Sequence, residues 1–150
     1  MQLSTKGRYA VMALLDLLAM QKEKGKPYPV KLSEIAERQE ISLSYLEQLF
    51  AQLRREKIVT SVRGPGGGYL LKHAPEQTWL STVIAAVDEP VKFRRCTGEG
   101  GNCMSNGSKC NTHHLWGALE DHLNHFLQTV NLEMVATKNL PGLSGIRNEN

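Results

Sequence analysis

The clearest indication of the fold lies in residues 42–71, which read SLSYLEQLFAQLRREKIVTSVRGPGGGYLL. Four apolar positions recur at the spacing of one helix face: Leu46, Leu49, Phe50 and Leu53. The opposite face is rich in hydroxyl, amide and basic groups: Ser44, Tyr45, Gln48, Gln52 and Arg55. The helix is expected to begin at Ser42 or Ser44, because either hydroxyl can cap it and Ser44 with Glu47 fits a capping box. The pattern predicts a helix with one face in the core and one polar face.

A β-hairpin is expected directly after this helix. Residues 58–62 alternate as a strand, residues 63–68 supply turn chemistry, and residues 69–71 read as the return strand. A hairpin in this place is typical of the wing of a winged helix, and Arg63 at its shoulder is a candidate for the minor groove of DNA. The glycines do not form a phosphate loop, because no Gly-Lys-Ser/Thr follows them and Tyr69 stands where a dinucleotide site needs glycine.

Two helices precede the stretch. A helix capped by Ser4 or Thr5 is apolar on nearly every side and is therefore expected to be buried. A short helix with Ser33 as its N-cap follows, and residues 39–42 make a tight turn. Two short helices joined by a tight turn indicate a helix-turn-helix, although an ordinary surface helix gives a similar pattern. The hairpin favours the DNA-binding interpretation.

The second half of the chain divides into three parts. A fourth helix, capped by Thr78 and bearing Leu80, Val83, Ile84 and Val87, completes a winged helix-turn-helix domain over residues 1–90. Residues 91–112 contain almost no apolar side chain and cannot form a core unaided. Residues 113–136 form a long amphipathic helix whose apolar stripe exceeds what one small domain needs, so we expect it to pair two chains as a homodimer. Residues 137–150 are expected to form a flexible tail. The predicted fold is mainly α with a small β-hairpin.

The charge distribution favours an anionic partner for the first part of the chain. The formal net charge is +3, but residues 1–95 hold 15 basic against 10 acidic side chains and residues 96–150 hold 3 against 5. Double-stranded DNA fits the basic half. No signal peptide or apolar stretch of membrane-spanning length is seen, so a cytoplasmic location with no membrane partner is expected.

Three cysteines and a histidine indicate a metal centre. Cys96, Cys103 and Cys110 have six residues in each gap, and His113 and His114 follow shortly after. In a reducing compartment such thiols serve as ligands more readily than as disulfides. Zinc accepts the same ligand types, and the wide gaps also suit a two-iron, two-sulfur cluster, so chemistry leaves both metals and both histidines open. An enzyme is not expected, since no acidic residue is placed to orient a Cys/His pair and there is no sign of a small-molecule substrate site.

Four segments of this sequence resemble one family. The start LSTKGRYA (residues 3–10), the helix ISLSYLEQLF (41–50), the wing SVRGPGGGY (61–69) and Cys110-x-x-His113 are similar to the IscR-type iron-sulfur winged-helix transcription regulators. The likeness extends over roughly residues 1–135.

The resemblance implies a homodimeric regulator of iron-sulfur cluster assembly genes. It implies a 2Fe-2S cluster on Cys96, Cys103, Cys110 and His113. It further implies DNA contacts from the helix and wing, which here are Ser42, Ser44, Tyr45, Gln48 and Arg63. Glu47, beside the reading face, is a candidate for base specificity because a carboxylate there is repelled by phosphates or accepts from cytosine. The alternatives are a redox- or nitric-oxide-sensing repressor with a different cluster, and a constitutive DNA-binding protein with a structural zinc.

Overall fold

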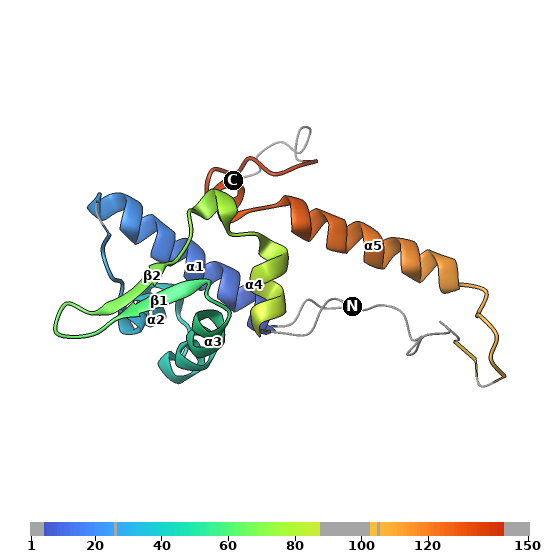
Figure 1. Ribbon diagram of the computed structural model, residues 1–150, viewed down its shortest axis with the longest axis horizontal. Coiled ribbons are helices and arrows are strands. Elements are labelled where there is room, and N and C mark those ends of the chain that lie inside the picture. Colours follow the sequence, from blue (N-terminus) through green and yellow to red (C-terminus); the bar gives the residue numbers. More distant parts are fainter. Residues whose placement is uncertain (1–4, 26, 88–102, 105, 143–150) are drawn as a thin grey trace.

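A computed structural model describes residues 5–25, 27–87, 103–104 and 106–142 of the chain. Its elements are α1 (Thr5–Lys24), α2 (Leu32–Gln39), α3 (Leu43–Arg55), β1 (Val59–Val62), β2 (Gly68–Leu71), the 3-10 turn η1 (Pro75–Gln77), α4 (Leu80–Val87), α5 (His113–Thr129) and α6 (Leu132–Ala136). Figure 1 shows the first helices and the hairpin gathered into one body, from which α5 extends. The prediction of a mainly α fold with one small hairpin is confirmed.

The core is built around α1. Ala10, Ala13, Leu14 and Leu17 are fully buried, which agrees with the expectation of a helix that is apolar on nearly every side. α2, α3, α4, β2 and α6 all contact this helix. A central helix surrounded by its neighbours buries apolar surface on several sides, and this burial is the main stabilising term of so small a domain.

α2 and α3 form the predicted helix-turn-helix, with a different start for α2. Its N-cap is Lys31, with no side-chain hydrogen bond, and Ser33 lies inside the first turn. Leu32 enters the core at 9% exposure, so the helix begins early enough to bury it. Glu40 ends α2 in the left-handed region at φ 53°, and its N–H donates to the carbonyl of Ala36.

A buried carboxylate fixes α2 against α1. Arg38 donates to Asp16 from Nε at 2.9 Å and from Nη2 at 2.7 Å, and Gln39 Nε2 donates to the same carboxylate at 2.9 Å. The side chain of Asp16 is 4% exposed and that of Arg38 is 35% exposed. The hydrogen bonds to Asp16 raise the pKa of the Arg38 guanidinium, which therefore stays charged. The ion pair holds α2, and through it the turn into α3, at one orientation on the central helix.

The hairpin is antiparallel and joined to the rest of the domain by its return strand. Val59 pairs with Leu71 and Val62 with Gly68. Val30, before α2, adds an isolated bridge to Tyr69, with N···O distances of 3.0 and 2.8 Å. A Cβ on Gly68 would lie 2.5 Å from the carbonyl oxygen of Val30, so this approach requires glycine.

The helix expected over residues 113–136 is divided in two. α5 ends at Thr129, Val130 turns into an extended conformation, and α6 starts at Leu132. Val130 and Leu132 are fully buried in the domain core. The division arises because the chain returns to the domain, where Asn131 bridges to Trp79 and its side chain caps α6.

α4 depends on this return. The N–H of Leu80 donates to the carbonyl of Val130 at 2.9 Å, and the N–H of Leu132 donates to the carbonyl of Thr78 at 3.0 Å. Thr78 was expected to cap α4, but its hydroxyl donates to the carbonyl of Ala74. A backbone carbonyl from residues far along the chain takes over part of the capping role.

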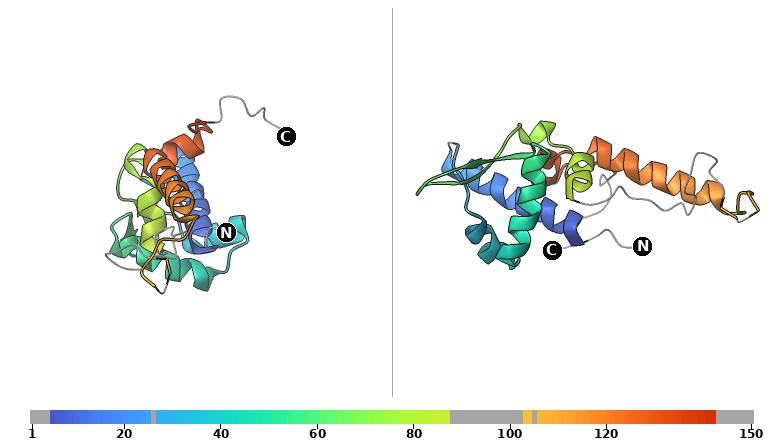
Figure 2. Two further views of the ribbon diagram at one scale, coloured as in Figure 1. Left: turned by 90° about the vertical axis from the view of Figure 1, so that its right-hand side faces the viewer. Right: turned by 60° about the horizontal axis from the view of Figure 1, so that its bottom comes forward.

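Figure 2 shows α5 leaving the helical body and extending well beyond it. Most of the segment 91–112 and the tail after residue 142 lie outside the described residues. Within the described ranges, no helix is both long and apolar enough to cross a membrane.

Candidate functional site

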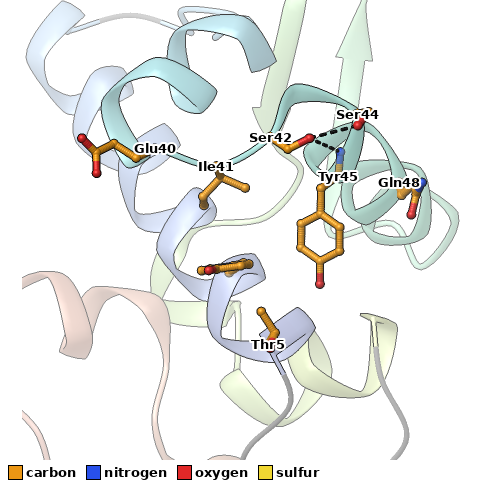
Figure 3. Close-up of a pocket in the computed structure, with 8 residues that line it drawn as sticks. Thr5, Glu40, Ile41, Ser42, Ser44, Tyr45 and Gln48 are labelled. Carbon is orange, nitrogen blue, oxygen red and sulfur yellow. Dashed lines mark hydrogen bonds between the residues drawn. The ribbon is translucent and has the colours of Figure 1, made fainter.

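The polar face of α3 is prepared at its first turn. Ser42 is the N-cap, and its Oγ accepts from the N–H of Tyr45 at 3.4 Å and lies 2.9 Å from Oγ of Ser44 (Figure 3). Of the two starting points considered from sequence, the structure has the earlier one. Gln48 and Glu47 follow on the exposed surface of the same helix. A helix whose first two turns expose hydroxyl, amide and carboxylate groups can offer donors and acceptors to base edges in a major groove.

The start of α1 lies beside this face and encloses a depression with it. The depression has a volume of about 560 Å³ and is lined by Thr5, Tyr9, Glu40, Ile41, Ser42, Ser44, Tyr45 and Gln48 (Figure 3). The rings of Tyr9 and Tyr45 meet edge to face, with centroids 5.8 Å apart and planes at 85°. An edge-to-face contact favours one orientation of the two rings, so α1 helps to position a side chain of α3.

Sequence reasoning missed Thr5, Tyr9 and Glu40 as parts of this surface. Thr5 and Tyr9 were noted only within the helix that was expected to be buried, and Glu40 only within a turn. A signal existed in the first segment of the family resemblance, residues 3–10, which is more polar than a helix in the core requires.

Arg63 lies apart from the α3 residues, just beyond the end of β1. It is exposed, and Gly64 beside it adopts φ 103°, a conformation that glycine tolerates. The structure therefore brings Ser42, Ser44, Tyr45 and Gln48 together on one surface and places Arg63 on the hairpin turn. This separation is the one expected of a helix in a major groove and a wing beside it.

The proposed ligands approach each other at the start of α5. Sγ of Cys103 lies 3.0 Å from Nδ1 of His113. A compact turn makes this possible, because the N–H groups of Cys103 and Met104 both donate to the carbonyl of Ser108 at 3.1 Å. His113 is the first residue of α5, and its N–H donates to the carbonyl of Cys110 at 3.0 Å. His114 is exposed, and its ring packs edge to face against the ring of His113.

Cys110 has a different neighbour. Its Sγ lies 3.7 Å from Oγ1 of Thr112, and that same oxygen accepts from the indole Nε1 of Trp116 at 3.1 Å. Neither Thr112 nor Trp116 was singled out as a site residue from the sequence.

The donor set suits iron and sulfide. Cys96 lies outside the described residues, and among those described no three His, Cys, Asp or Glu side chains converge as a complete metal site. The contact between a thiol and an imidazole, with a second thiol seven residues along, nevertheless supplies the soft ligand types that a cluster accepts.

A helix-turn-helix followed directly by a hairpin, with a polar face on its second helix, defines a winged-helix DNA-binding protein. Residues 3–138 match the Rrf2 family, which is described as an iron-dependent transcriptional regulator. The chain belongs to this family and is a transcriptional regulator.

Relatives and solved structures agree with this membership. The HTH-type transcriptional regulator IscR of Escherichia coli (strain SMS-3-5) is 51% identical over 146 residues, which cover 97% of this chain and 86% of the relative. The T. potens IscR structure matches with a TM-score of 0.73 and 29% identity, over 100% of this chain and 93% of that one. CymR (YrzC), the global cysteine regulator of B. subtilis, matches with a TM-score of 0.75 and 28% identity, over 92% and 98%. The E. coli relative and CymR are named as regulators, in agreement with the prediction that this chain is not an enzyme.

Proposed function

We propose that this regulator binds a 2Fe-2S cluster through Cys96, Cys103, Cys110 and His113, and that the cluster controls its affinity for operators of iron-sulfur cluster assembly genes. One observation carries the proposal: Cys103 Sγ and His113 Nδ1 lie 3.0 Å apart at the start of the protruding helix. The iron-dependence in the family description and the IscR name of the relatives support the choice of iron over zinc. A protein that binds chromosomal DNA in this way acts in the cytoplasm.

The mixed ligand set fits a sensor. When bound, the cluster supplies one-electron redox chemistry and a fixed point for a segment that has little apolar surface of its own. An imidazole from His113 in place of a thiolate raises the reduction potential of such a cluster. Of the two adjacent histidines, His113 is the one we propose as ligand, since Cys103 contacts its ring.

We further propose that the protein acts as a homodimer on double-stranded DNA. Leu115, Trp116 and Phe126 on α5 are 59%, 36% and 36% exposed, which is more apolar surface than one helix of a lone chain usually leaves in water. Pairing two copies of α5 covers this surface and presents two α3 helices to successive major grooves. Ser42, Ser44, Tyr45 and Gln48 then face base edges or nearby phosphates, and Arg63 faces the minor groove.

The return of the chain into the core supplies a physical link between the ligands and the DNA-binding face. His113 is the first residue of α5. Beyond the other end of this helix, Val130 and Leu132 are fully buried in the core that also contains residues of α1, α3 and α4. A change in the direction of α5 therefore moves the DNA-binding domains of the two subunits relative to each other. If this coupling is allosteric, operator DNA must in turn alter cluster retention.

The test compares four proteins purified without oxygen: the unchanged chain, Cys103→Ala, His113→Ala and the matched control His122→Ala, which changes an exposed histidine of the same helix. We expect visible absorption with equal iron and sulfide in the unchanged chain and the control. Cys103→Ala and His113→Ala should lose or weaken it, and should bind operator DNA with altered affinity. Zinc without sulfide would overturn the cluster proposal, and equal affinity of all four proteins for every operator would overturn the switch.

Dimer formation is tested separately by sedimentation equilibrium. Leu115→Glu places a charge on the most exposed apolar residue of α5 and should shift the protein to monomer, because a buried unpaired carboxylate is costly. Gln128→Glu adds the same charge at an exposed polar position of the helix and should leave the dimer intact. A monomeric unchanged chain would refute the assembly.

A further inference from the structure

Thr112 stands where a helix normally takes its cap, but its side chain is not used for that purpose. It is the N-cap residue of α5 and makes no side-chain capping hydrogen bond. Threonine is favoured at an N-cap because its oxygen accepts from an N–H of the first turn. The hydroxyl of Thr112 is directed elsewhere, which calls for another role.

Two groups meet this hydroxyl. The indole Nε1 of Trp116, one turn further along α5, donates to Oγ1 at 3.1 Å. Sγ of Cys110 lies 3.7 Å from the same oxygen, within the reach of a hydrogen bond to sulfur. Indole nitrogen can only donate, so Oγ1 must accept from Trp116 and its own hydrogen remains available for Cys110. A thiolate carries no hydrogen, so once Cys110 is deprotonated only the hydroxyl can be the donor.

We propose that Thr112, oriented by Trp116, is a positioning residue that donates a hydrogen bond to Cys110 Sγ and thereby raises the reduction potential of the centre that Cys110 ligates. The inference rests on the proposed function, since it concerns a ligand of the proposed cluster. A donor to a ligand sulfur stabilises negative charge there, and reduction adds negative charge, so the hydrogen bond favours the reduced state. Polarisation along the chain from indole to hydroxyl to sulfur strengthens the last bond.

The two hydrogen bonds from Trp116 to Thr112 and from Thr112 to Cys110 also give a role to the indole of Trp116 near the start of α5. Trp116 is 36% exposed and still satisfies its single donor within its own chain. Here the partner is the residue between two proposed ligands.

The experiment measures the midpoint potential of the anaerobically purified, cluster-loaded protein by following its visible absorption. Thr112→Val keeps the shape and removes the donor, Thr112→Ser keeps the donor, and Trp116→Phe keeps the aromatic ring and removes the indole N–H. Trp79→Phe is the matched control, since Trp79 is similarly exposed at 39% but pairs with Asn131, beyond the far end of α5.

Thr112→Val should favour the oxidised state about tenfold more than the unchanged chain does, which for one electron is a fall of about 59 mV. Trp116→Phe should move the potential in the same direction by less. Thr112→Ser and Trp79→Phe should match the unchanged chain. A purely structural role for Thr112 predicts lost cluster content without this pattern.

A second measurement separates this inference from the proposed function. Cobalt(II) is added to iron-free protein, and the thiolate-to-cobalt absorption band is compared between the unchanged chain, Thr112→Val and Thr112→Ser. A shift of the band in Val but not in Ser supports the hydrogen bond even if the native metal is zinc. Unchanged potentials in a cluster-loaded Thr112→Val protein overturn this inference alone, and a chain that binds neither cluster nor cobalt overturns both proposals.

Discussion

Two ion pairs with similar N···O distances but different burial allow the energetics of this fold to be tested directly. Arg38 Nη2 and Asp16 Oδ1 lie 2.7 Å apart, with side-chain exposures of 35% and 4%. Lys22 Nζ and Glu133 Oε2 lie 2.6 Å apart, with exposures of 50% and 25%. Distance alone would give the two pairs nearly equal strength. We expect burial to separate them.

The magnitudes follow from hydration. The buried Asp16 carboxylate accepts hydrogen bonds from Arg38 and Gln39. Replacing this carboxylate leaves the donors of Arg38 and Gln39 without their acceptor. Breaking a buried pair costs about 3–5 kcal/mol, but the guanidinium can partly return to water, so we expect a coupling free energy of about 2 kcal/mol. The exposed pair should contribute about 0.2–1 kcal/mol.

The assay is a pair of matched double-mutant cycles read by urea unfolding. Asp16→Asn is combined with Arg38→Met, and Glu133→Gln is combined with Lys22→Met, so that each cycle replaces a carboxylate by an amide and a cation by methionine. In 1 M salt, where the screening length is about 3 Å, the coupling of Lys22 to Glu133 should vanish and that of Asp16 to Arg38 should largely persist.

The choice of pH follows from the raised pKa of Arg38. A base whose folded-state pKa is raised contributes stability that is fully present below its unfolded pKa and is lost only as the pH rises through the folded value. For this guanidinium the loss falls in strongly alkaline solution, so deprotonation of Arg38 does not disturb measurements at neutral pH. A coupling for Lys22 and Glu133 equal to or greater than that for Asp16 and Arg38 would refute the reasoning from burial.

Three further predictions concern the core, the wing and the reading helix. Leu132→Ala should destabilise the protein by about 2–5 kcal/mol in urea unfolding, because Leu132 is fully buried and its loss leaves a cavity; a cost below about 1 kcal/mol would contradict this. Gly68→Ala should lower Tm and DNA affinity together, because the added Cβ would meet the carbonyl of Val30 at 2.5 Å, whereas Gly66→Ala, with nothing within 4 Å, should change stability little. Glu47→Ala should broaden the set of sequences recovered in a binding-site selection, and unchanged selectivity would remove its role.

The sequence predicted the elements of the DNA-binding domain well because each depends on local patterns. Apolar spacing marked α3, and the glycine-rich turn between two alternating stretches marked the hairpin. Cap positions were less predictable, since the need to bury Leu32 decided where α2 begins and made Ser33 an ordinary first-turn residue.

Contacts between distant parts of the chain could not be read from local patterns. Nothing near Asp16 indicates that Arg38 and Gln39 will meet it, and nothing in the amphipathic stripe marks Val130 as the point where it turns back into the core. The candidate site divides in the same way. The polar face of α3 followed from helical spacing, whereas the contribution of Tyr9 depends on how two helices cross.

The buried corner at Val130 and Leu132 has a consequence for modularity. In many regulators the DNA-binding domain can be separated from its dimerisation element and fused to another one. Here Val130 and Leu132, which follow α5, complete the hydrophobic core of the DNA-binding domain. A fragment ending at residue 87 would therefore lack part of its core. To build an artificial sensor from this protein, a new ligand-binding segment has to be inserted between residues 88 and 129. Val130, Leu132 and the short helix α6 have to be kept.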